Sequence, residues 1–282
     1  MAEHSITIGL TRSGRRKPGP LPYSDLDPAN WREYEDIELG SLWMFPSRAR
    51  GNGHANEYHG NYIPQIATQT LSRYTRADDV VLDLFLGSGT TALEAHRLGR
   101  KCIGVEIKRE LAVAVREKFP KDSDVRIVHA DSRTARATNG VKAALEEWGK
   151  ENAQFLMLHP PYHDIIRFSD IPGDLSNAET VDAFLDDFKK VAQRGYNLLE
   201  PGRFAVLVIG DKYADRELIP LGFFCMQAMM DVGFKLKSVV VKNVAGNEIG
   251  KGQRENLWRY RALRGGFYIF KHEYVMIMWK PA

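Results

Sequence analysis

Short apolar segments that alternate with amphipathic ones restrict the fold of this chain more than any other feature. Between residues 80 and 158, four apolar runs of strand length are separated by polar turns and stretches with helical spacing. The predicted strands are Val80–Phe85, Cys102–Glu106, Val125–Ala130 and Phe155–Leu158, and the predicted helices are Thr90–Leu98, Arg109–Phe119 and Val141–Trp148. Strands that are apolar on both faces and joined by helices pair in parallel. The sequence therefore predicts an α/β protein with a doubly wound, Rossmann-like sheet.

The second half of the chain continues this alternation and then changes it. The predicted elements are the helix Val181–Leu199, the strand Gly202–Ile209 and the helix Leu221–Val232, which Gly233 ends. Two further segments, Phe234–Val241 and Tyr268–Trp279, alternate like the two members of a hairpin. We therefore expect a mostly parallel sheet with an antiparallel hairpin at one edge.

The regions outside this pattern suggest how the chain is divided. Residues 1–57 are rich in Gly, Pro, Arg and Asn and show no sustained period, which predicts a basic, partly irregular arm. Residues 58–282 are expected to form one catalytic domain, which begins with a helix at Pro64–Tyr74. Within it, residues 243–267 are polar, Gly-rich and Arg-rich, and a loop of this length is usually functional or disordered.

Composition excludes several classes of protein. The chain of 282 residues is 44% hydrophobic and 27% charged, as expected of a soluble globular protein, and its net charge of +3 is too small to indicate a polyanionic partner. Cys102 and Cys225 each lie in an apolar run, so they form neither a disulfide framework nor a zinc site, and we expect no metal. No signal peptide or membrane-spanning run is visible, so we expect a cytoplasmic protein.

A Gly-rich turn, Gly87-Ser88-Gly89, follows the first predicted strand, where open α/β sheets bind ligands. Such a turn serves dinucleotides, phosphates and S-adenosylmethionine alike, and tight packing alone would also explain it. No Lys follows the glycines, so a nucleoside-triphosphate loop is absent. Asp83 at the strand end would repel a pyrophosphate and attract a cation, which favours a sulfonium ligand.

Acidic residues end the next two predicted strands. Glu106 lies about twenty residues beyond the glycines, where a carboxylate accepts hydrogen bonds from ribose hydroxyls in adenosine cofactors of several kinds. Asp131 and Ser132 lie at the same expected edge and could bind the adenine amino group. An acid at a strand end can also be a simple helix cap.

The most specific element is His159-Pro160-Pro161-Tyr162, directly after the fourth predicted strand. Two prolines fix φ and lack N–H groups, so a rigid turn presents free carbonyl acceptors. An extruded base could donate its amino hydrogens to such acceptors while the ring of Tyr162 stacks on it. A Pro-Pro loop with a packed tyrosine is the structural alternative, which a preceding cofactor turn disfavours.

Together these motifs resemble the adenine-N6 and cytosine-N4 DNA methyltransferases, whose cofactor motif reads Asp-Pro-Phe-x-Gly-Ser-Gly-Thr-Thr and whose catalytic tetrad is Asp/Asn/Ser-Pro-Pro-Tyr/Phe/Trp. The likeness extends upstream to residues 58–64 and downstream to residues 272–280. It implies a Rossmann-like methyltransferase sheet, S-adenosylmethionine as cofactor, and His159, Pro160, Pro161 and Tyr162 as the catalytic residues. It also implies a set of cofactor-binding residues: Asn61, Pro64, Asp83, Phe85, Gly87, Ser88, Gly89, Thr90, Glu106, Asp131 and Ser132.

Two departures from the family pattern leave questions open. The motif order is that of the subclass with a late recognition region, whereas the wording of the Gly-rich motif is closer to the subclass with the reverse order. His159 replaces the Asp or Ser that usually indicates the target base, so adenine N6 and cytosine N4 both remain candidates, with adenine weakly favoured. A neutral imidazole accepts a hydrogen bond and a protonated one does not, so activity should fall at acid pH.

DNA is the expected partner. Aromatic residues interleaved with arginines suit stacking and phosphate binding, which makes residues 243–267 a candidate DNA-contacting loop, with Arg254, Trp258, Arg259 and Arg264 as the contacts. The basic arm residues Arg12, Arg15, Arg16 and Lys17 would assist them. A solvated hairpin loop is the alternative. The loop is short for a recognition domain, which favours a short target site or a second subunit, and a cognate restriction endonuclease is another candidate partner.

Other functions compete with this interpretation. RNA and protein-glutamine methyltransferases also use Pro-Pro-Tyr tetrads, usually opened by Asp or Asn. A nucleic-acid-binding module with a vestigial fold would not bind the cofactor, and the intact glycines and acids oppose it. A nicotinamide dehydrogenase gives no role to the Pro-Pro-Tyr turn.

Overall fold

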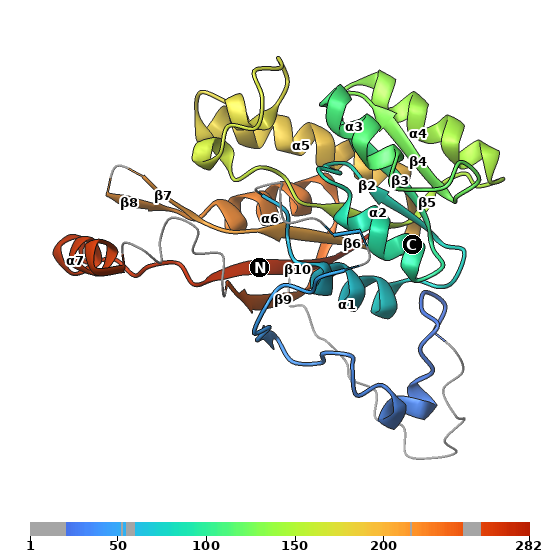
Figure 1. Ribbon diagram of the computed structural model, residues 1–282, viewed down its shortest axis with the longest axis horizontal. Coiled ribbons are helices and arrows are strands. Elements are labelled where there is room, and N and C mark those ends of the chain that lie inside the picture. The colour runs from blue at the N-terminus through green and yellow to red at the C-terminus, as the bar shows by residue number, and fades with distance from the viewer. Residues whose placement is uncertain (1–20, 52, 55–59, 215, 245–254) are drawn as a thin grey trace, which may run out of the picture.

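The structure is a computed structural model that describes residues 21–51, 53–54, 60–214, 216–244 and 255–282 (Figure 1). Up to the middle of the chain the elements are η1 (Pro28–Glu33), β1 (Leu42–Trp43), α1 (Pro64–Tyr74), β2 (Val80–Asp83), α2 (Thr90–Arg97), β3 (Lys101–Glu106), α3 (Arg109–Arg116), β4 (Val125–His129), α4 (Ala135–Glu147) and β5 (Ala153–Leu158). They are followed by η2 (His163–Ile165), η3 (Leu175–Asn177), α5 (Val181–Leu198), β6 (Leu199–Ile209), β7 (Lys212–Ala214), β8 (Glu217–Ile219), α6 (Leu221–Val232), β9 (Lys235–Asn243), α7 (Glu255–Gly265) and β10 (His272–Trp279).

The main sheet has the strand order β1-β9-β10-β6-β5-β2-β3-β4. Strands β4, β3, β2, β5 and β6 are parallel neighbours, whereas β10 pairs antiparallel with both β6 and β9. The predicted fold class is therefore confirmed, including the antiparallel hairpin. The two-residue strand β1 adds to the outside of this hairpin, in parallel with β9.

The sheet separates two hydrophobic cores, and its strands alternate between them. Val80 and Leu82 of β2 pack in one core, which α4, α5 and α6 cover, while Val81 packs in the other, which α1, α2 and α3 cover. Leu156 and Phe155 of β5 divide in the same way. Because both faces of these strands are buried, their sequences are continuous apolar runs.

The helices begin and end where their sequences provide caps. Thr134 and Thr180 precede α4 and α5, and each hydroxyl accepts from a backbone amide three residues on. Gly233 ends α6 with a φ of 120°, which a residue with a side chain rarely adopts. Among the described residues, no helix is long and apolar enough to cross a lipid bilayer.

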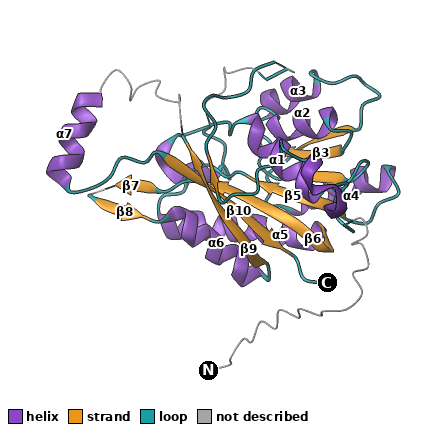
Figure 2. Ribbon diagram, turned by 90° about the horizontal axis from the view of Figure 1, so that it is seen from below, coloured by secondary structure: helices purple, strands orange, loops and turns teal. Residues whose placement is uncertain are grey.

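The predicted loop at residues 243–267 differs from the structure in part. Strand β9 continues to Asn243, and residues 255–265 form the helix α7 rather than a loop. Helix α7 and the two-stranded ribbon β7–β8 project together from one end of the molecule (Figures 1 and 2). The ring of Tyr213 on β7 contacts the ring of Phe267, just beyond α7, with 4.4 Å between centroids.

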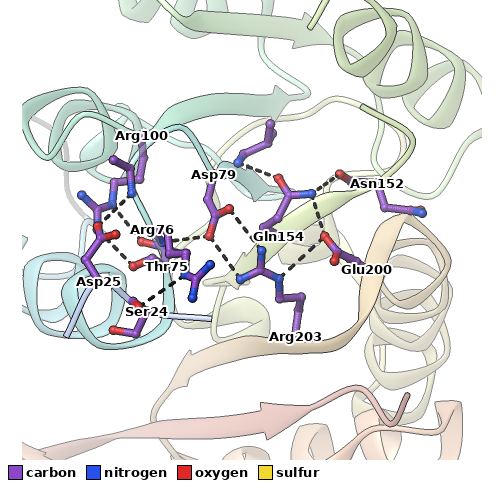
Figure 3. A network of polar contacts seen from close by, with 12 residues as sticks. Ser24, Asp25, Thr75, Arg76, Asp79, Arg100, Asn152, Gln154, Glu200 and Arg203 are labelled. Carbon is purple, nitrogen blue, oxygen red and sulfur yellow. Dashed lines mark hydrogen bonds and ion pairs between the residues drawn. The ribbon is translucent and has the colours of Figure 1, made fainter. Parts of the chain in front are cut away.

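A buried polar network lies where strands β2, β5 and β6 begin (Figure 3). The guanidinium of Arg203 donates to both carboxylate oxygens of Asp79 at 3.1 and 3.2 Å. Gln154 accepts from the amide of Val80 and donates to Glu200, so the strand ends are linked to one another. The network lies at the amino ends of these strands and leaves their carboxyl ends for a site.

The same network attaches the arm to the domain. Asp25 accepts from Arg100 at 2.8 Å and from the amide of Ala77 at 2.8 Å. Arg76 donates to the carbonyls of Leu21 and Ser24. The first described residues of the predicted arm are thus held against the turns that precede β2 and β3. The basic residues Arg12, Arg15, Arg16 and Lys17 lie outside the described residues.

Replacing Arg203 with Met should lower the free energy of unfolding by about 3 kcal/mol, because it leaves the carboxylate of Asp79 buried without its cation. Urea denaturation of both chains measures the difference. Lys189→Met is the matched control, since it breaks an ion pair with Asp231 that is nearly half exposed, and it should leave the free energy of unfolding nearly unchanged. Equal losses in the two variants would contradict the role assigned to the network.

Candidate active site

A pocket with an empty volume of about 630 Å³ opens at the carboxyl ends of β2, β3 and β5. It brings together eight of the residues predicted from the sequence: Asn61, Phe85, Gly87, Thr90, Glu106, His159, Pro160 and Pro161. The carboxyl ends of parallel strands meet at one sheet edge, so motifs separated by about 70 residues of chain share one cavity. Seven predicted residues do not line this pocket: Pro64, Asp83, Ser88, Gly89, Asp131, Ser132 and Tyr162.

The Gly-rich turn needs its glycines for two separate reasons. Gly87 and Gly89 have φ values of 54° and 87°, in the left-handed region that favours glycine. A Cβ on Gly89 would also lie 2.7 Å from the Cγ1 atom of Val115, so the turn packs tightly against α3. The side-chain amide of Asn61 donates to the hydroxyl of Ser88 and ties the segment before α1 to the turn.

Glu106 connects β3 to the Gly-rich turn. Its carboxylate accepts from the amide of Gly87 through Oε2 and from the amide of Lys108 through Oε1, each at 2.9 Å. The residue lines the pocket but is only 7% exposed, and this burial raises the pKa of its carboxyl group to about 7. The carboxylate therefore holds the turn in place and still faces the cavity.

Asp83 lies behind the turn instead of in the pocket. It is buried, and its carboxylate accepts from the amide of Phe85 at 2.8 Å and from the hydroxyl of Thr91. Because Thr91 donates its one proton to Asp83, its oxygen accepts from the hydroxyl of Tyr62 at 2.6 Å. Burial raises the pKa of Asp83 to about 6. Its charge can act on a ligand only across the turn.

Asp131 and Ser132 are engaged in the protein. Both oxygens of Asp131 accept from the guanidinium of Arg133, and a Cβ on Gly173 would lie 2.5 Å from Oδ2. Ser132 donates to the carbonyl of Leu84 at 2.6 Å. In this arrangement Asp131 orders the neighbouring loop, and its carboxylate is not presented to the pocket.

The ring of His159 is enclosed by two tyrosines. Its centroid lies 5.2 Å from that of Tyr62 and 5.7 Å from that of Tyr162, and both tyrosine rings are nearly perpendicular to it. Burial lowers the pKa of His159 to about 4, so the imidazole is neutral at neutral pH. Within the described part of the chain, nothing hydrogen-bonds to its ring nitrogens. The ring thus offers one acceptor and one donor to a ligand in the pocket.

The loop after the tetrad forms another wall of the pocket. His163 has a φ of 54°, and its ring donates to the carbonyl of Ala178 and accepts from Lys212 Nζ, each at 2.9 Å. Lys212 also binds Asp164, which fixes the turn to β7. Further along, the ring of Phe168 packs so closely on Gly60 that a Cβ there would come within 2.6 Å of it.

Seven residues that line the pocket are not among the site residues predicted from the sequence: Gly60, Tyr62, Leu86, Ile107, Lys108, Phe168 and Asp174. Tyr62 could have been found, because it lies in the segment before α1 that carried part of the family resemblance. Lys108 donates to the carbonyl of Phe168 at 3.2 Å, a contact between residues 60 positions apart that no local pattern indicates. No group of three or more His, Cys, Asp or Glu side chains among the described residues could hold a metal ion.

The predicted nucleic-acid contacts do not line the pocket. Arg259 and Arg264 are exposed on α7, and Arg264 donates to the hydroxyl of Tyr260 at 3.2 Å. Trp258 belongs to the same helix, and Arg254 lies outside the described residues. These contacts stay a prediction.

The N-terminal part of the chain matches a known protein family. The profile of the N6 and N4 methylase family, described as DNA methylase, matches residues 13–117. The type II methyltransferase M.ScaI of Streptomyces caespitosus is 35% identical over 79 residues, which make up 26% of each chain. The resemblance to the DNA methylase family is confirmed. The profile match includes the Gly-rich turn and Glu106 and ends before His159.

Other similar proteins have names that denote different activities. The ribosomal protein L11 methyltransferase of Thermus thermophilus is 38% identical over 79 residues, 28% of each chain. The structure of TrmN from Thermus thermophilus superimposes with a TM-score of 0.50 and 18% identity, over 79% of this chain and 50% of that one. The chain thus matches about a quarter of the length of the curated relatives, and the structural likeness shows the shared fold alone.

Glu106→Gln should change how stability depends on pH. The pKa of Glu106 is raised in the folded chain, so the folded state binds more protons than the unfolded state, and stability falls as the pH rises from about 4.5 to 7. Relative to the parent chain, the variant should therefore gain about 3 kcal/mol between pH 4.5 and pH 8. Urea unfolding at both pH values measures this gain, with Glu110→Gln on the exposed side of α3 as control. If the free energy of unfolding depends on pH in the same way in Glu106→Gln and in the parent chain, the pKa of Glu106 is not raised.

Proposed function

We propose that this chain transfers a methyl group from S-adenosylmethionine to an exocyclic amino nitrogen of a DNA base, adenine N6 or cytosine N4. One observation carries the proposal: a glycine turn with a carboxylate beside it shares a single pocket with His159 and Pro160. The first pair suits an adenosine cofactor and the second suits an amino group. The match to the DNA methylase family supports the choice of substrate.

The pocket residues fit such a cofactor. The carboxylate of Glu106 faces the cavity and would accept from ribose hydroxyls, while Gly87 lets the backbone approach the ligand and Phe85 lines the same wall. Asn61 and Thr90 would complete the contacts. When bound, S-adenosylmethionine supplies a methyl group on a positively charged sulfur, and the buried anion of Asp83 favours that charge from behind the turn.

The tetrad would bind and orient the acceptor. A neutral His159 accepts one amino hydrogen and the carbonyl of Pro160 can accept the other, which directs the nitrogen lone pair toward the methyl group. The bound cofactor would supply the methyl group and keep the S–C bond electrons as a neutral thioether, and the methylated amino group would release one proton to solvent. Because the pKa of His159 is about 4, the loss of activity at acid pH that the sequence predicts should begin only near that value.

Helix α7 and the neighbouring ribbon would contact the nucleic acid outside the pocket. Arg259 and Arg264 are exposed, as are Tyr260 and Tyr268, at 57% and 94%. Cationic and aromatic side chains on one projection suit phosphate contacts and base stacking. A second subunit or a cognate restriction endonuclease could add recognition surface.

RNA and protein acceptors are the alternatives, and the relative named for ribosomal protein L11 keeps a protein acceptor open. Tritiated S-adenosylmethionine offered with unmethylated DNA, transfer RNA and release-factor protein separates these substrates. Expression in a methylation-free host followed by single-molecule sequencing then reports the base and its context. A chain that binds no cofactor in calorimetry would be a binding module instead.

His159→Ala and Tyr162→Ala should each lower the rate of methyl transfer about 100-fold or more, because both remove groups that orient the acceptor. Cofactor affinity, measured by calorimetry, should change less than about threefold, since Glu106 and the glycine turn are intact. Full transfer by either variant would refute the proposed role of the tetrad.

Charge reversal of Arg259 and Arg264 together should weaken DNA binding at every sequence tested. It should also reduce the slope of log affinity against log salt by about two, one for each phosphate that the protein no longer neutralises. Fluorescence anisotropy at several salt concentrations measures the slope. The double reversal of Asp186 and Lys189 on α5 keeps the net charge and serves as control, and a slope unchanged by the arginine variant would rule out α7 as a DNA-binding element.

A further inference from the structure

A buried polar chain joins the tyrosine of the tetrad to two strands on the other side of β6. Glu273 Oε2 accepts from the hydroxyl of Tyr162 at 3.0 Å, and Glu273 Oε1 accepts from Lys242 Nζ at 2.9 Å. Lys242 and Glu273 are directly opposed partners on β9 and β10, with side chains only 5% and 12% exposed. Both carboxylate oxygens are therefore engaged, one by a cation and one by the phenol.

Stability alone does not explain this arrangement. Removing two charges from water costs several kcal/mol for each ion, and well-packed apolar side chains of similar volume often stabilise a fold as well or better. β9 and β10 are already paired along eight residues of each strand. The Lys242–Glu273 pair adds what apolar residues could not, which is a fixed anionic acceptor for the hydroxyl of Tyr162.

The acceptor determines how the Tyr162 ring lies. One edge of the ring contacts Gly210, where a Cβ would come 3.0 Å from Cε2, and the ring stands at 88° to that of His159. The hydroxyl at the far end of the ring is held by Glu273. With the backbone end fixed by the Pro160-Pro161 turn, both ends of the side chain are held, and the ring keeps one orientation against His159.

We propose that Glu273 and Lys242 are positioning residues for methyl transfer: the ion pair holds the Tyr162 hydroxyl and so keeps the ring, and with it His159, in the orientation that receives the acceptor base. This inference rests on the proposed function and assigns it two further residues. It requires a hydroxyl on the tetrad aromatic, because a phenylalanine could stack equally well but could not bind the carboxylate.

The test is a set of variants that separates the hydrogen bond from the ion pair. Tyr162→Phe removes the donor, Glu273→Leu with Lys242→Met removes the acceptor and both charges, and Glu273→Gln with Lys242→Met removes the charges but keeps an acceptor oxygen. The first two should lower kcat about tenfold or more with KM for DNA and cofactor affinity nearly unchanged, because misplaced groups slow the chemical step. The glutamine variant should recover kcat to within about threefold of the parent.

Combining the variants gives the decisive measurement. If Glu273 acts through Tyr162, adding Glu273→Leu and Lys242→Met to Tyr162→Phe should not lower kcat any further. If the fold-decreases in kcat of the two sets of substitutions multiply when they are combined, the inference is wrong. Full activity of Tyr162→Phe would also overturn it. Thermal unfolding of each variant, with Lys189→Met as an unrelated ion-pair control, identifies a loss that is only structural. If the parent chain itself methylates no DNA, the proposed function fails. If the parent is active and the effects of the substitutions on kcat are independent, only this inference is refuted.

Discussion

The parallel pairing of β2 with β3 and β5 is the constraint on which the rest of this molecule depends. Hydrogen-bonded register brings the ends of three strands to one edge, so Phe85, Glu106 and His159 line a single pocket although they are distant in the chain. Glu106 reinforces the arrangement by accepting from the amide of Gly87 across the edge. The polar network around Asp79 and Arg203 links β2 and β5 to β6 at the opposite ends of these strands. The strands that form this edge are thus linked to one another at both ends.

Buried polar groups gather around this edge at a cost to stability. Burial raises the pKa values of Asp83 and Glu106 and lowers that of His159, so all three resist carrying charge. The Lys242–Glu273 pair is almost enclosed as well. Such groups are typical of sites in which position and polarity carry the chemistry. The neutral state of His159 fits a residue that accepts an amino hydrogen at neutral pH.

Local patterns predict most of the sheet and its glycine turn, and they fail where no period exists. The strands around β2 and β5 are apolar on both faces and easily recognised, and Gly87 and Gly89 have the positive φ that their positions suggest. The sequence of helix α7 predicts a loop instead, because it is polar on most sides and has glycines close after its end. Asp83 and Asp131 are expected from the sequence to face the ligand, but Thr91 and Arg133 bind their carboxylates.

The sequence by itself determined the α/β alternation, the glycine turn and the Pro160-Pro161 acceptors, because each depends on backbone preferences and on spacing within a few residues. Only the tertiary structure decided which polar groups meet. Tyr162 and Glu273 are 111 residues apart, and Lys242 opposes Glu273 through the register of β9 and β10. Asp83 and Asp131 are bound by Thr91 and Arg133, only 8 and 2 residues away, so the folded conformation of each turn decided that these two carboxylates do not line the pocket. Glu106, whose carboxylate binds the amide of Gly87 across the strand edge, does line it.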